Sequence, residues 1–279
     1  MMTASQAIAQ HKIGLRAGLN RSIISAENLE EGEDYSSRGG FHFGVNYTYQ
    51  VAPRFGIRGE LLFTQRGSKF TYSDDNSYTA ITPIDRTITP FFDFGQTEVE
   101  LELSNGYLSV PITAQFQITP KIELFGGASV DFLLNPTGRG TLDYVSNNKP
   151  DDIFFLKSYD HSYRTDTLGQ IPFGAMTTAI LVNSTRTDLI RTESAYLNLQ
   201  EGDKDGTKFN FVDAHVIVGA NYFINNGFYI GLRYEYGLFD ITNTGADFTL
   251  EFLDENENYI RREDSDFSRA FSLSIGFRF

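Results

Sequence analysis

The last nine residues of the chain alternate strictly between two kinds of side chain. In residues 271–279 the odd positions hold Phe, Leu, Ile, Phe and Phe, and the even positions hold Ser, Ser, Gly and Arg. Because successive side chains of a β-strand point to opposite faces, the pattern predicts a strand with one bulky apolar face. Such an edge is seldom left open at the end of a soluble protein, whereas a closed barrel pairs its last strand with its first. The segment therefore favours a membrane-spanning β-barrel, with residues 12–20 as the partner strand.

Seven further segments share this period of two. In residues 41–51, six apolar side chains alternate with five polar or small ones. Such regularity is hard to obtain by chance. The sequence thus predicts an all-β protein, an eight-stranded antiparallel up-and-down transmembrane barrel. The expected strands are residues 12–24, 41–51, 55–72, 99–118, 122–134, 209–224, 228–241 and 271–279.

The expected fourth strand contains an irregularity. Its apolar residues are odd-numbered from Val99 to Leu103 and even-numbered from Leu108 to Ile118. A phase change of one residue within a strand requires a β-bulge. We therefore expect a bulge at Asn105-Gly106.

The connections alternate between short and long. Turns of about three residues follow the second, fourth and sixth strands, whereas the other connections are longer, and the third spans about residues 140–208. Short periplasmic turns and long extracellular loops are typical of outer-membrane barrels, whereas a soluble sandwich would have turns of more equal length. An even number of strands places both termini on the periplasmic side.

The apolar face of the strands is expected to point outward. An eight-stranded barrel has an interior just wide enough for side chains to fill, and the many Phe, Tyr, Leu, Ile and Val residues would overfill it. The small and charged face fits the lumen. We therefore expect the aromatic residues to face lipid, with tyrosines forming the interfacial girdle in a chain that has no tryptophan.

Composition excludes several classes of function. The net charge of −13 argues against nucleic acid as a partner, because phosphates require a basic surface. The absence of cysteine excludes a disulfide framework and cysteine-based zinc or redox chemistry. No run of about 18 apolar residues encodes a membrane helix. No cofactor is expected.

Residues 1–10 are expected to be the remnant of a secretory signal peptide. Ala7-Ile8-Ala9 fits the small-x-small cleavage pattern, with Gln10 as the new amino terminus. The alternative is an ordinary terminal segment. The barrel domain would then comprise residues 11–279.

Several strand segments resemble a known family. They are Lys12-Ile-Gly-Leu-Arg-Ala-Gly-Leu-Asn20, Glu60-Leu-Leu-Phe-Thr-Gln-Arg-Gly67, Tyr107-Leu-Ser-Val-Pro111 and Tyr234-Glu-Tyr-Gly-Leu238, together with the final Phe279. They look like the strands of the PorT-like outer-membrane β-barrel proteins of Bacteroidetes. The resemblance implies an outer-membrane location in a Gram-negative bacterium. The final Phe resembles the signal read by the β-barrel assembly machinery during insertion. PorT itself is linked to the type IX secretion system.

The small face of the strands carries charged residues that would meet in the lumen. Unpaired, each would carry a large desolvation penalty, whereas together they can form a satisfied network. We interpret them as a structural polar plug, with a proton or ion path as the alternative. The residues are Lys12, Arg16, Arg58, Glu60, Arg66, Glu123, Asp131, Asp213, His215, Arg233, Glu235 and Arg278.

Two histidines, His42 and His215, are also expected in the lumen. Asp213 lies two residues from His215 on the same face, and such a pair could act as a general base. No nucleophile motif accompanies it. A structural role is therefore favoured over catalysis, and no catalytic residue is assigned.

Two acidic segments have oxygen ligands at calcium-like spacing. Neither has the glutamate that closes a calcium loop, so a solvated loop is favoured over a metal site. The candidate ligands are Asp203, Asp205, Asp254, Asn256 and Asn258.

The expected function is that of a non-enzymatic integral outer-membrane protein. It would contact outer-membrane lipid and act as a scaffold or partner-binding subunit of an envelope or secretion complex. The third loop contains an apolar segment, residues 171–182, that could fold as a small docking cap. The alternatives are a lipid-modifying outer-membrane enzyme and a narrow channel.

Overall fold

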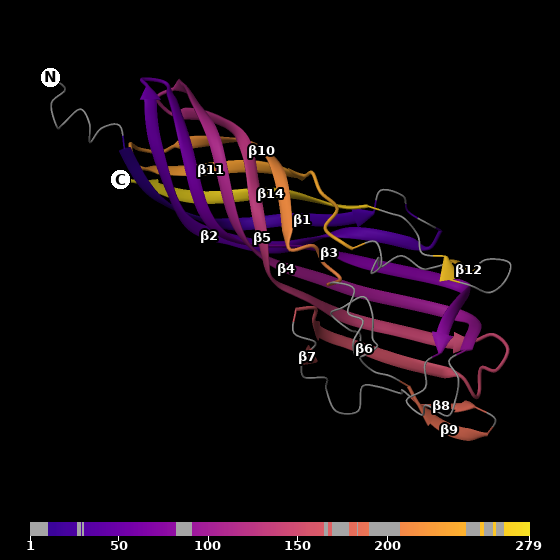
Figure 1. The fold of residues 1–279 in the computed structure, drawn as a ribbon. Helices are drawn as coiled ribbons and strands as arrows, with labels where there is room; N and C mark the ends of the chain where they lie inside the picture. The colour runs from indigo at the N-terminus through magenta and orange to yellow at the C-terminus, as the bar shows by residue number, and fades with distance from the viewer. Residues whose placement is uncertain are drawn as a thin grey trace.

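Eight antiparallel strands close into a ring (Figure 1). The computed structural model describes residues 11–26, 29, 31–81, 91–164, 167–168, 179–182, 184–189, 207–243, 252–253, 259–260 and 265–279. The ring comprises β1 (His11–Ala26), β2 (Glu33–Ala52), β3 (Phe55–Ile81), β4 (Phe91–Thr119), β5 (Ile122–Ser146), β10 (Val212–Phe223), β11 (Phe228–Gly237) and β14 (Asp266–Arg278). In the described part of the chain, no helix is long and apolar enough to cross a membrane.

The last strand closes the ring against the first, as predicted. β14 pairs antiparallel with β1 from Gly14 opposite Arg278 to Ala26 opposite Asp266. The short turns follow β2, β4 and β10, and they lie at the end of the barrel where β1 begins and β14 ends. We call this end the turn end.

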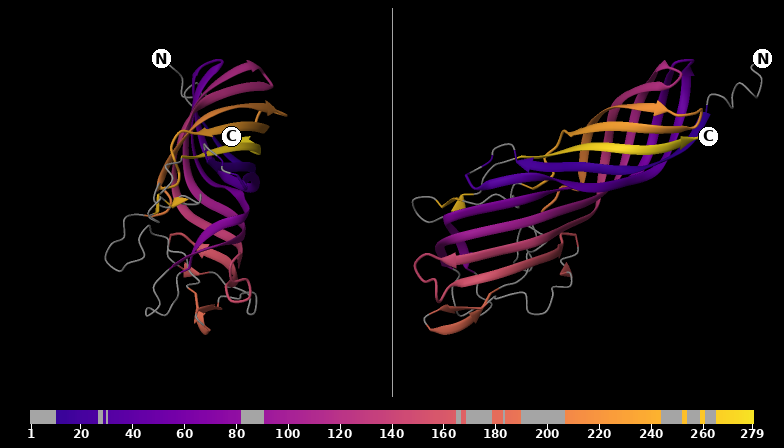
Figure 2. Two further views of the ribbon diagram at one scale, coloured as in Figure 1. Left: turned by 90° about the vertical axis from the view of Figure 1, so that its right-hand side faces the viewer. Right: turned by 180° about the vertical axis from the view of Figure 1, so that it is seen from behind.

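At the opposite end, three barrel strands continue far beyond the ring as an open sheet (Figures 1 and 2). β3, β4 and β5 have 27, 29 and 25 residues, whereas about 9–11 residues of a tilted strand suffice to cross a bilayer. Residues 122–132 of β5 pair with β10, whereas residues 137–145 pair with β6 (Phe154–Ser162). β6 in turn pairs with β7 (Thr167–Leu168). We call residues 68–81, 91–105, 135–146 and 154–162 the projecting sheet.

The projecting sheet corrects the predicted loops. The expected third and fifth strands end too early, at residues 72 and 134, and the expected fourth strand begins too late, at residue 99. The expected loop 140–208 contains the end of β5 and all of β6–β9. β10 and β11 are shorter than expected. The long strands escaped prediction because their upper parts are polar on the outside and irregular in composition, so they lack the bulky outward alternation of the lipid-facing segments.

The inner face of the projecting sheet, on the same side of the strands as the lumen, is covered by two apolar clusters. One, at its base, includes Phe70, Leu103 and Tyr163. The other, at its tip, packs Ile180 and Leu189 from the β8–β9 segment against Tyr144 and other sheet residues. β8 (Ala179–Val182) and β9 (Thr185–Asp188) form a small hairpin, and β12 (Phe252–Leu253) pairs with β13 (Tyr259–Ile260). Part of the apolar segment 171–182 is therefore folded, while residues 171–178 lie outside the described residues.

The predicted bulge in β4 is wrong. The odd residues of β4 face inward along its whole length, from Leu101 and Leu103 in the projecting sheet to Thr113 in the barrel. The apolar residues change from odd to even positions because the surroundings of the strand change. The outer side of β4 faces lipid in the barrel and water in the projecting sheet. The extra residue belongs to β5 instead, where Leu134 is skipped between the pairs Gly106–Asn135 and Tyr107–Leu133.

The barrel presents an apolar band to lipid. Outward side chains such as Leu15, Leu61 and Ile112 are about half exposed, although they are large and apolar. Tyr47 and Tyr49 near the turn end, and Tyr234 and Tyr236 at the other, are also exposed, as expected for interfacial girdles. The expectation that the aromatic residues face lipid fails for four rings that point into the lumen. They are Tyr107, Phe125, Phe223 and Tyr229.

Candidate functional site

The inner faces of the barrel strands bring charged side chains together in the lumen. Arg66 on β3 lies between two carboxylates: its Nη1 is 2.8 Å from Asp131 Oδ2 on β5, and its Nη2 is 2.8 Å from Glu235 Oε2 on β11. These three side chains are almost completely buried. Because β3 is not adjacent to β5 or β11 in the ring, the two ion pairs tie separate walls of the barrel together.

Further ion pairs extend this arrangement across the lumen. Glu60 Oε1 is 3.4 Å from Arg16 Nη1, and its other oxygen contacts Arg233. Arg233 Nη1 in turn lies 3.3 Å from Glu235 Oε1. The charges therefore alternate in sign along one connected chain that runs from Arg16 to Asp131.

A second, smaller cluster lies nearer the turn end. Glu123 accepts hydrogen bonds from Arg58 Nη2 at 3.1 Å and from Arg278 Nη1 at 3.2 Å. Asn221 Nδ2 donates to Glu123 Oε1 at 2.8 Å. Three donors thus surround this buried carboxylate, as its desolvation requires.

Acidic and basic side chains alternate within the described barrel. Five arginines and one histidine meet five carboxylates, and each of these eleven residues lies within 4 Å of a residue of the opposite class, whereas Lys12, the twelfth predicted member, has no such partner in the described part of the chain. A buried network in which each charge has an opposite partner can be stable, whereas an unpaired member would not be. The residues so placed are Arg16, Arg58, Glu60, Arg66, Glu123, Asp131, Asp213, His215, Arg233, Glu235 and Arg278.

His215 lies between two carboxylates. Its Nδ1 is 2.7 Å from Asp131 Oδ2, and its Nε2 is 3.4 Å from Asp213 Oδ2. The hydroxyl of Ser129 donates to Asp131 at 3.3 Å and not to the imidazole. Both ring nitrogens thus face carboxylates, so neither points at a serine that it could deprotonate.

His42 has neutral partners. Its Nδ1 is 2.6 Å from Asn20 Oδ1, and its Nε2 is 2.9 Å from Ser274 Oγ. Ser272 Oγ donates to the same Asn20 oxygen at 2.9 Å. This polar cluster holds β1, β2 and β14 together and contains no carboxylate.

Inward-facing aromatic rings, which the alternation did not predict, cover the guanidinium groups. Arg278 lies 4.4 Å from the centre of the Phe223 ring, and Arg66 lies 5.6 Å from that of Tyr107. An arginine above an aromatic face gains electrostatic attraction and loses contact with water. A gap at this level, lined by Asn20, Arg66, Arg233 and other side chains, admits no water molecule. The described part of the lumen is therefore packed at this level.

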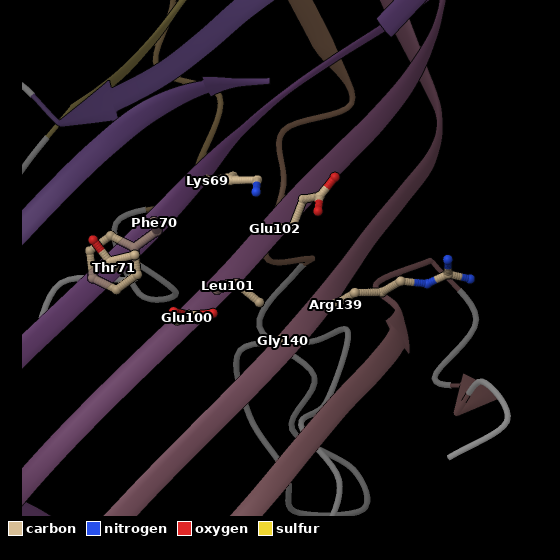
Figure 3. Close-up of a pocket in the computed structure, with 8 residues that line it drawn as sticks. All are labelled: Lys69, Phe70, Thr71, Glu100, Leu101, Glu102, Arg139 and Gly140. Atoms are coloured by element: carbon tan, nitrogen blue, oxygen red, sulfur yellow. The ribbon is translucent and has the colours of Figure 1, made fainter. Parts of the chain in front are cut away.

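A groove lies on the outer face of the projecting sheet (Figure 3). Its volume is about 380 Å³. Its floor is the backbone of β3, β4 and β5, and its sides are formed by alternating charges. Glu102 lies opposite Lys69 on one neighbouring strand and opposite Arg139 on the other. The lining residues are Lys69, Phe70, Thr71, Glu100, Leu101, Glu102, Arg139 and Gly140.

Above this groove the outer face is acidic. Glu98 and Glu100 follow Glu102 at alternate positions of β4, and Asp143 lies directly opposite Glu98 on β5. Asp34 of β2 pairs with Thr71, the residue opposite Glu100. Carboxylates that face one another across strands destabilise the sheet slightly, and this part of the outer face carries an excess of negative charge.

Two tyrosines of the projecting sheet are bonded to carboxylates. Tyr144 Oη donates to Asp93 Oδ2 at 3.0 Å, and Tyr72 Oη donates to Asp74 Oδ2 at 3.0 Å. Burial, followed by these hydrogen bonds, raises the pKa of both phenols. The phenols are therefore held in the neutral form, which suits a packed structural position.

The candidate calcium ligands lie outside the described residues. They are Asp203, Asp205, Asp254, Asn256 and Asn258. Within the described ranges, no group of three or more His, Asp or Glu side chains could hold a metal ion.

Several solved structures and one protein family are similar to this chain. Similar solved structures include Ail, the attachment invasion locus protein of Yersinia pestis, with 12% identity over 97% of this chain and 99% of that chain and a TM-score of 0.36. Others are Neisserial surface protein A, with 10% identity over 95% of each chain and a TM-score of 0.31, and the outer membrane protease OmpT from Escherichia coli, with 8% identity over 96% of each chain and a TM-score of 0.29. No curated protein sequence matches the chain. Residues 5–243 match the family described as outer membrane protein beta-barrel domain, and the chain therefore belongs to this family of outer-membrane β-barrels.

Proposed function

We propose that the protein is a non-enzymatic, non-conducting outer-membrane subunit whose barrel anchors the projecting sheet for binding of a partner protein. The observation that carries the proposal is the contrast between the two halves. The barrel lumen is filled with paired charges, while three of its strands continue into a sheet with a charged outer face. The resemblance to PorT-like proteins supports a place in an envelope or secretion complex, such as a type IX-like system.

A narrow channel is the first alternative. Ion flow would require water between Arg66 and the opposite wall, where the side chains leave no room for it. We expect purified protein in planar bilayers to show no steady large openings. Regular single-channel steps in wild-type protein would defeat the non-conducting proposal.

A lipid-modifying enzyme is the second alternative. His215 would be its general base, but carboxylates face both of its nitrogens and its side chain is fully buried. We expect no lipid turnover above that of a His215→Ala control. Turnover that disappears in this variant would replace the scaffold proposal by an enzymatic one.

The acidic outer face of the projecting sheet is the proposed docking surface. Its carboxylates would attract a basic partner, and such attraction weakens as salt is added. We expect E98Q/E100Q/D143N to weaken co-purification of the partner, whereas D151N/D152N, in an exposed turn, should leave it unchanged. Equal recovery with both variants would remove this face from the proposal.

The orientation of the barrel is also part of the proposal. We place both termini in the periplasm and the projecting sheet outside the cell. The chain contains no cysteine, so a single introduced thiol reports its own position. A membrane-impermeant maleimide added to intact cells should label T141C on the projecting sheet but not K121C at the turn end. The reverse pattern would invert the orientation.

A further inference from the structure

One edge of β5 changes its partner where the barrel meets the projecting sheet. The other edge pairs with β4 in both parts of the strand, whereas this edge pairs with β10 up to Phe132 and with β6 from Thr137 onward (Figure 1). Pro136 lies at the division. Its carbonyl accepts a hydrogen bond of 3.0 Å from the backbone of Tyr163, but proline has no N–H to donate in return. The sheet therefore branches between Phe132 and Thr137.

A pocket of about 170 Å³ lies between the two branches, and we call it the fork pocket. Its buried lining comes from Leu133, Tyr163 and Phe209, which belong to the apolar cluster at the base of the projecting sheet. The rings of Tyr163 and Phe209 meet edge to face, with their centres 5.3 Å apart. An apolar protein cavity of about 150 Å³ is large enough to bind benzene. The fork pocket thus has the size and the walls to hold one aromatic ring.

The exposed lining of the fork pocket adds a cation. It consists of Arg164, Thr207 and Phe211. Nη1 of Arg164 donates to the carbonyl of Leu134 at 2.5 Å, and this bond holds the guanidinium at the pocket. No carboxylate among the described residues pairs with Arg164. A guanidinium has five N–H donors, so Nε and Nη2 keep donors for a ligand.

We infer that the fork pocket binds a small carboxylate that carries one aromatic ring. The ring would contact Tyr163 and Phe209, because aromatic side chains favour edge-to-face and offset contacts with another ring. The carboxylate would accept two parallel hydrogen bonds from Nε and Nη2 of Arg164. An inorganic anion would use only the arginine, and a neutral hydrocarbon would use only the apolar walls. The inference is independent of the partner proposed for the outer face of the projecting sheet.

The test compares an aromatic acid with its uncharged amide. 4-Fluorobenzoate and 4-fluorobenzamide are each titrated into folded protein in a nonionic detergent, and binding is followed by fluorine nuclear magnetic resonance. Titration of protein-free micelles corrects for partition into the detergent. We expect saturable binding of the acid to wild-type protein with a Kd of about 1 mM, which suits a ligand of this size. The amide should bind about fivefold more weakly, because it cannot form the ion pair with Arg164.

Three variants locate the site. R164Q should weaken binding of the acid about fivefold and leave binding of the amide unchanged. Thr207→Trp adds a large ring to the exposed lining and should abolish saturable binding of both compounds. The control R54Q removes an exposed cation from a turn at the opposite end of the barrel, and it should change neither affinity by more than about twofold.

Equal affinity of wild-type protein for the acid and the amide would overturn the inference, as would the absence of saturable binding of the acid. Equal binding of the acid by wild-type protein and R164Q would remove the arginine from the site. Full binding in T207W would place the ligand elsewhere on the protein and overturn the inference as well. The heat-dependent shift on a denaturing gel verifies that each variant is folded. The comparison of the acid with the amide needs no variant, so it decides the inference even if R164Q does not fold.

Discussion

Replacing Arg66 by methionine should destabilise the barrel strongly. The guanidinium shares two ion pairs of 2.8 Å with Asp131 and Glu235, and its side chain is 1% exposed. Methionine retains much of the volume but leaves both carboxylates with one cationic partner fewer. Removing one partner of a buried ion pair costs about 3–5 kcal/mol, and loss of the contact with the Tyr107 ring costs about 1 kcal/mol more. We therefore expect R66M to lower the free energy of unfolding by about 4–6 kcal/mol.

An ion pair of almost the same length provides the control. Arg139 Nε lies 2.9 Å from Asp160 Oδ1 on the projecting sheet, but the arginine side chain is 76% exposed. Exposed pairs contribute less than about 1 kcal/mol, so R139M should change stability little. Urea-induced unfolding in detergent micelles, followed by circular dichroism and by the gel shift of folded protein, measures both variants.

The outcome depends on burial and charge, not on distance. A loss in R66M within about 1 kcal/mol of that in R139M would refute the reasoning that links burial to the energy of the network. R66M/D131N removes one of the two abandoned carboxylates and should recover about 1–2 kcal/mol. Additive losses in the double variant would show that uncompensated charge is not the cause.

Two further changes test local contacts. Tyr144→Phe removes the hydrogen bond to Asp93 and should cost about 1 kcal/mol. The pKa of Tyr144 is raised in the folded protein. The wild-type protein should therefore lose stability as the pH rises above about 10, the ordinary pKa of tyrosine, and Y144F should lose less. Equal pH profiles of urea unfolding for the two proteins would count against this expectation. At Gly276 an added Cβ would lie 2.2 Å from the Tyr229 ring, whereas at Gly59 it would meet no atom within 4 Å. G276A should therefore cost about 1–3 kcal/mol and G59A much less, and similar unfolding midpoints would show that the lumen can relax.

The sequence predicts the barrel well because lipid imposes a uniform rule on its strands. Outward residues such as Phe43 and Ile275 must be apolar wherever the strand crosses the bilayer, so the period of two is regular. The strand order and the seam between β1 and β14 follow from that pattern and from turn lengths. The projecting sheet obeys a different rule, since its outer face meets water and its inner face meets side chains, and no single pattern covers both parts of one strand.

The charged residues of the lumen could be identified from alternation, but their pairing could not. Which carboxylate contacts Arg66 depends on the shear of the barrel, because the partners lie on strands far apart in sequence. The bulge at Leu134 changes which residues of β5 face inward. It was missed because the expected fifth strand ended at residue 134, although Pro136 is a residue type that strands accept mainly at edges and bulges. The inward rings of Phe125 and Phe223 were missed because aromatic residues were assigned to lipid as a class.

Two explanations of the apolar pattern in β4 can be distinguished by labelling: a strand that keeps its phase while its surroundings change, and a strand with a bulge. Positions 102 and 103 are expected to face water and the inner cluster, respectively, because the strand keeps its phase and Leu103 is fully buried. A bulge at residues 105–106 would instead place position 103 on the lipid-facing side with Leu108 and turn position 102 inward. In a chain without cysteine, E102C should react quickly with a water-soluble maleimide, and L103C should react only after unfolding. Matched unfolding curves for the two variants would ensure that a difference in labelling rate reports the direction of the side chain and not local unfolding. Faster labelling of L103C than of E102C would support a bulge in β4.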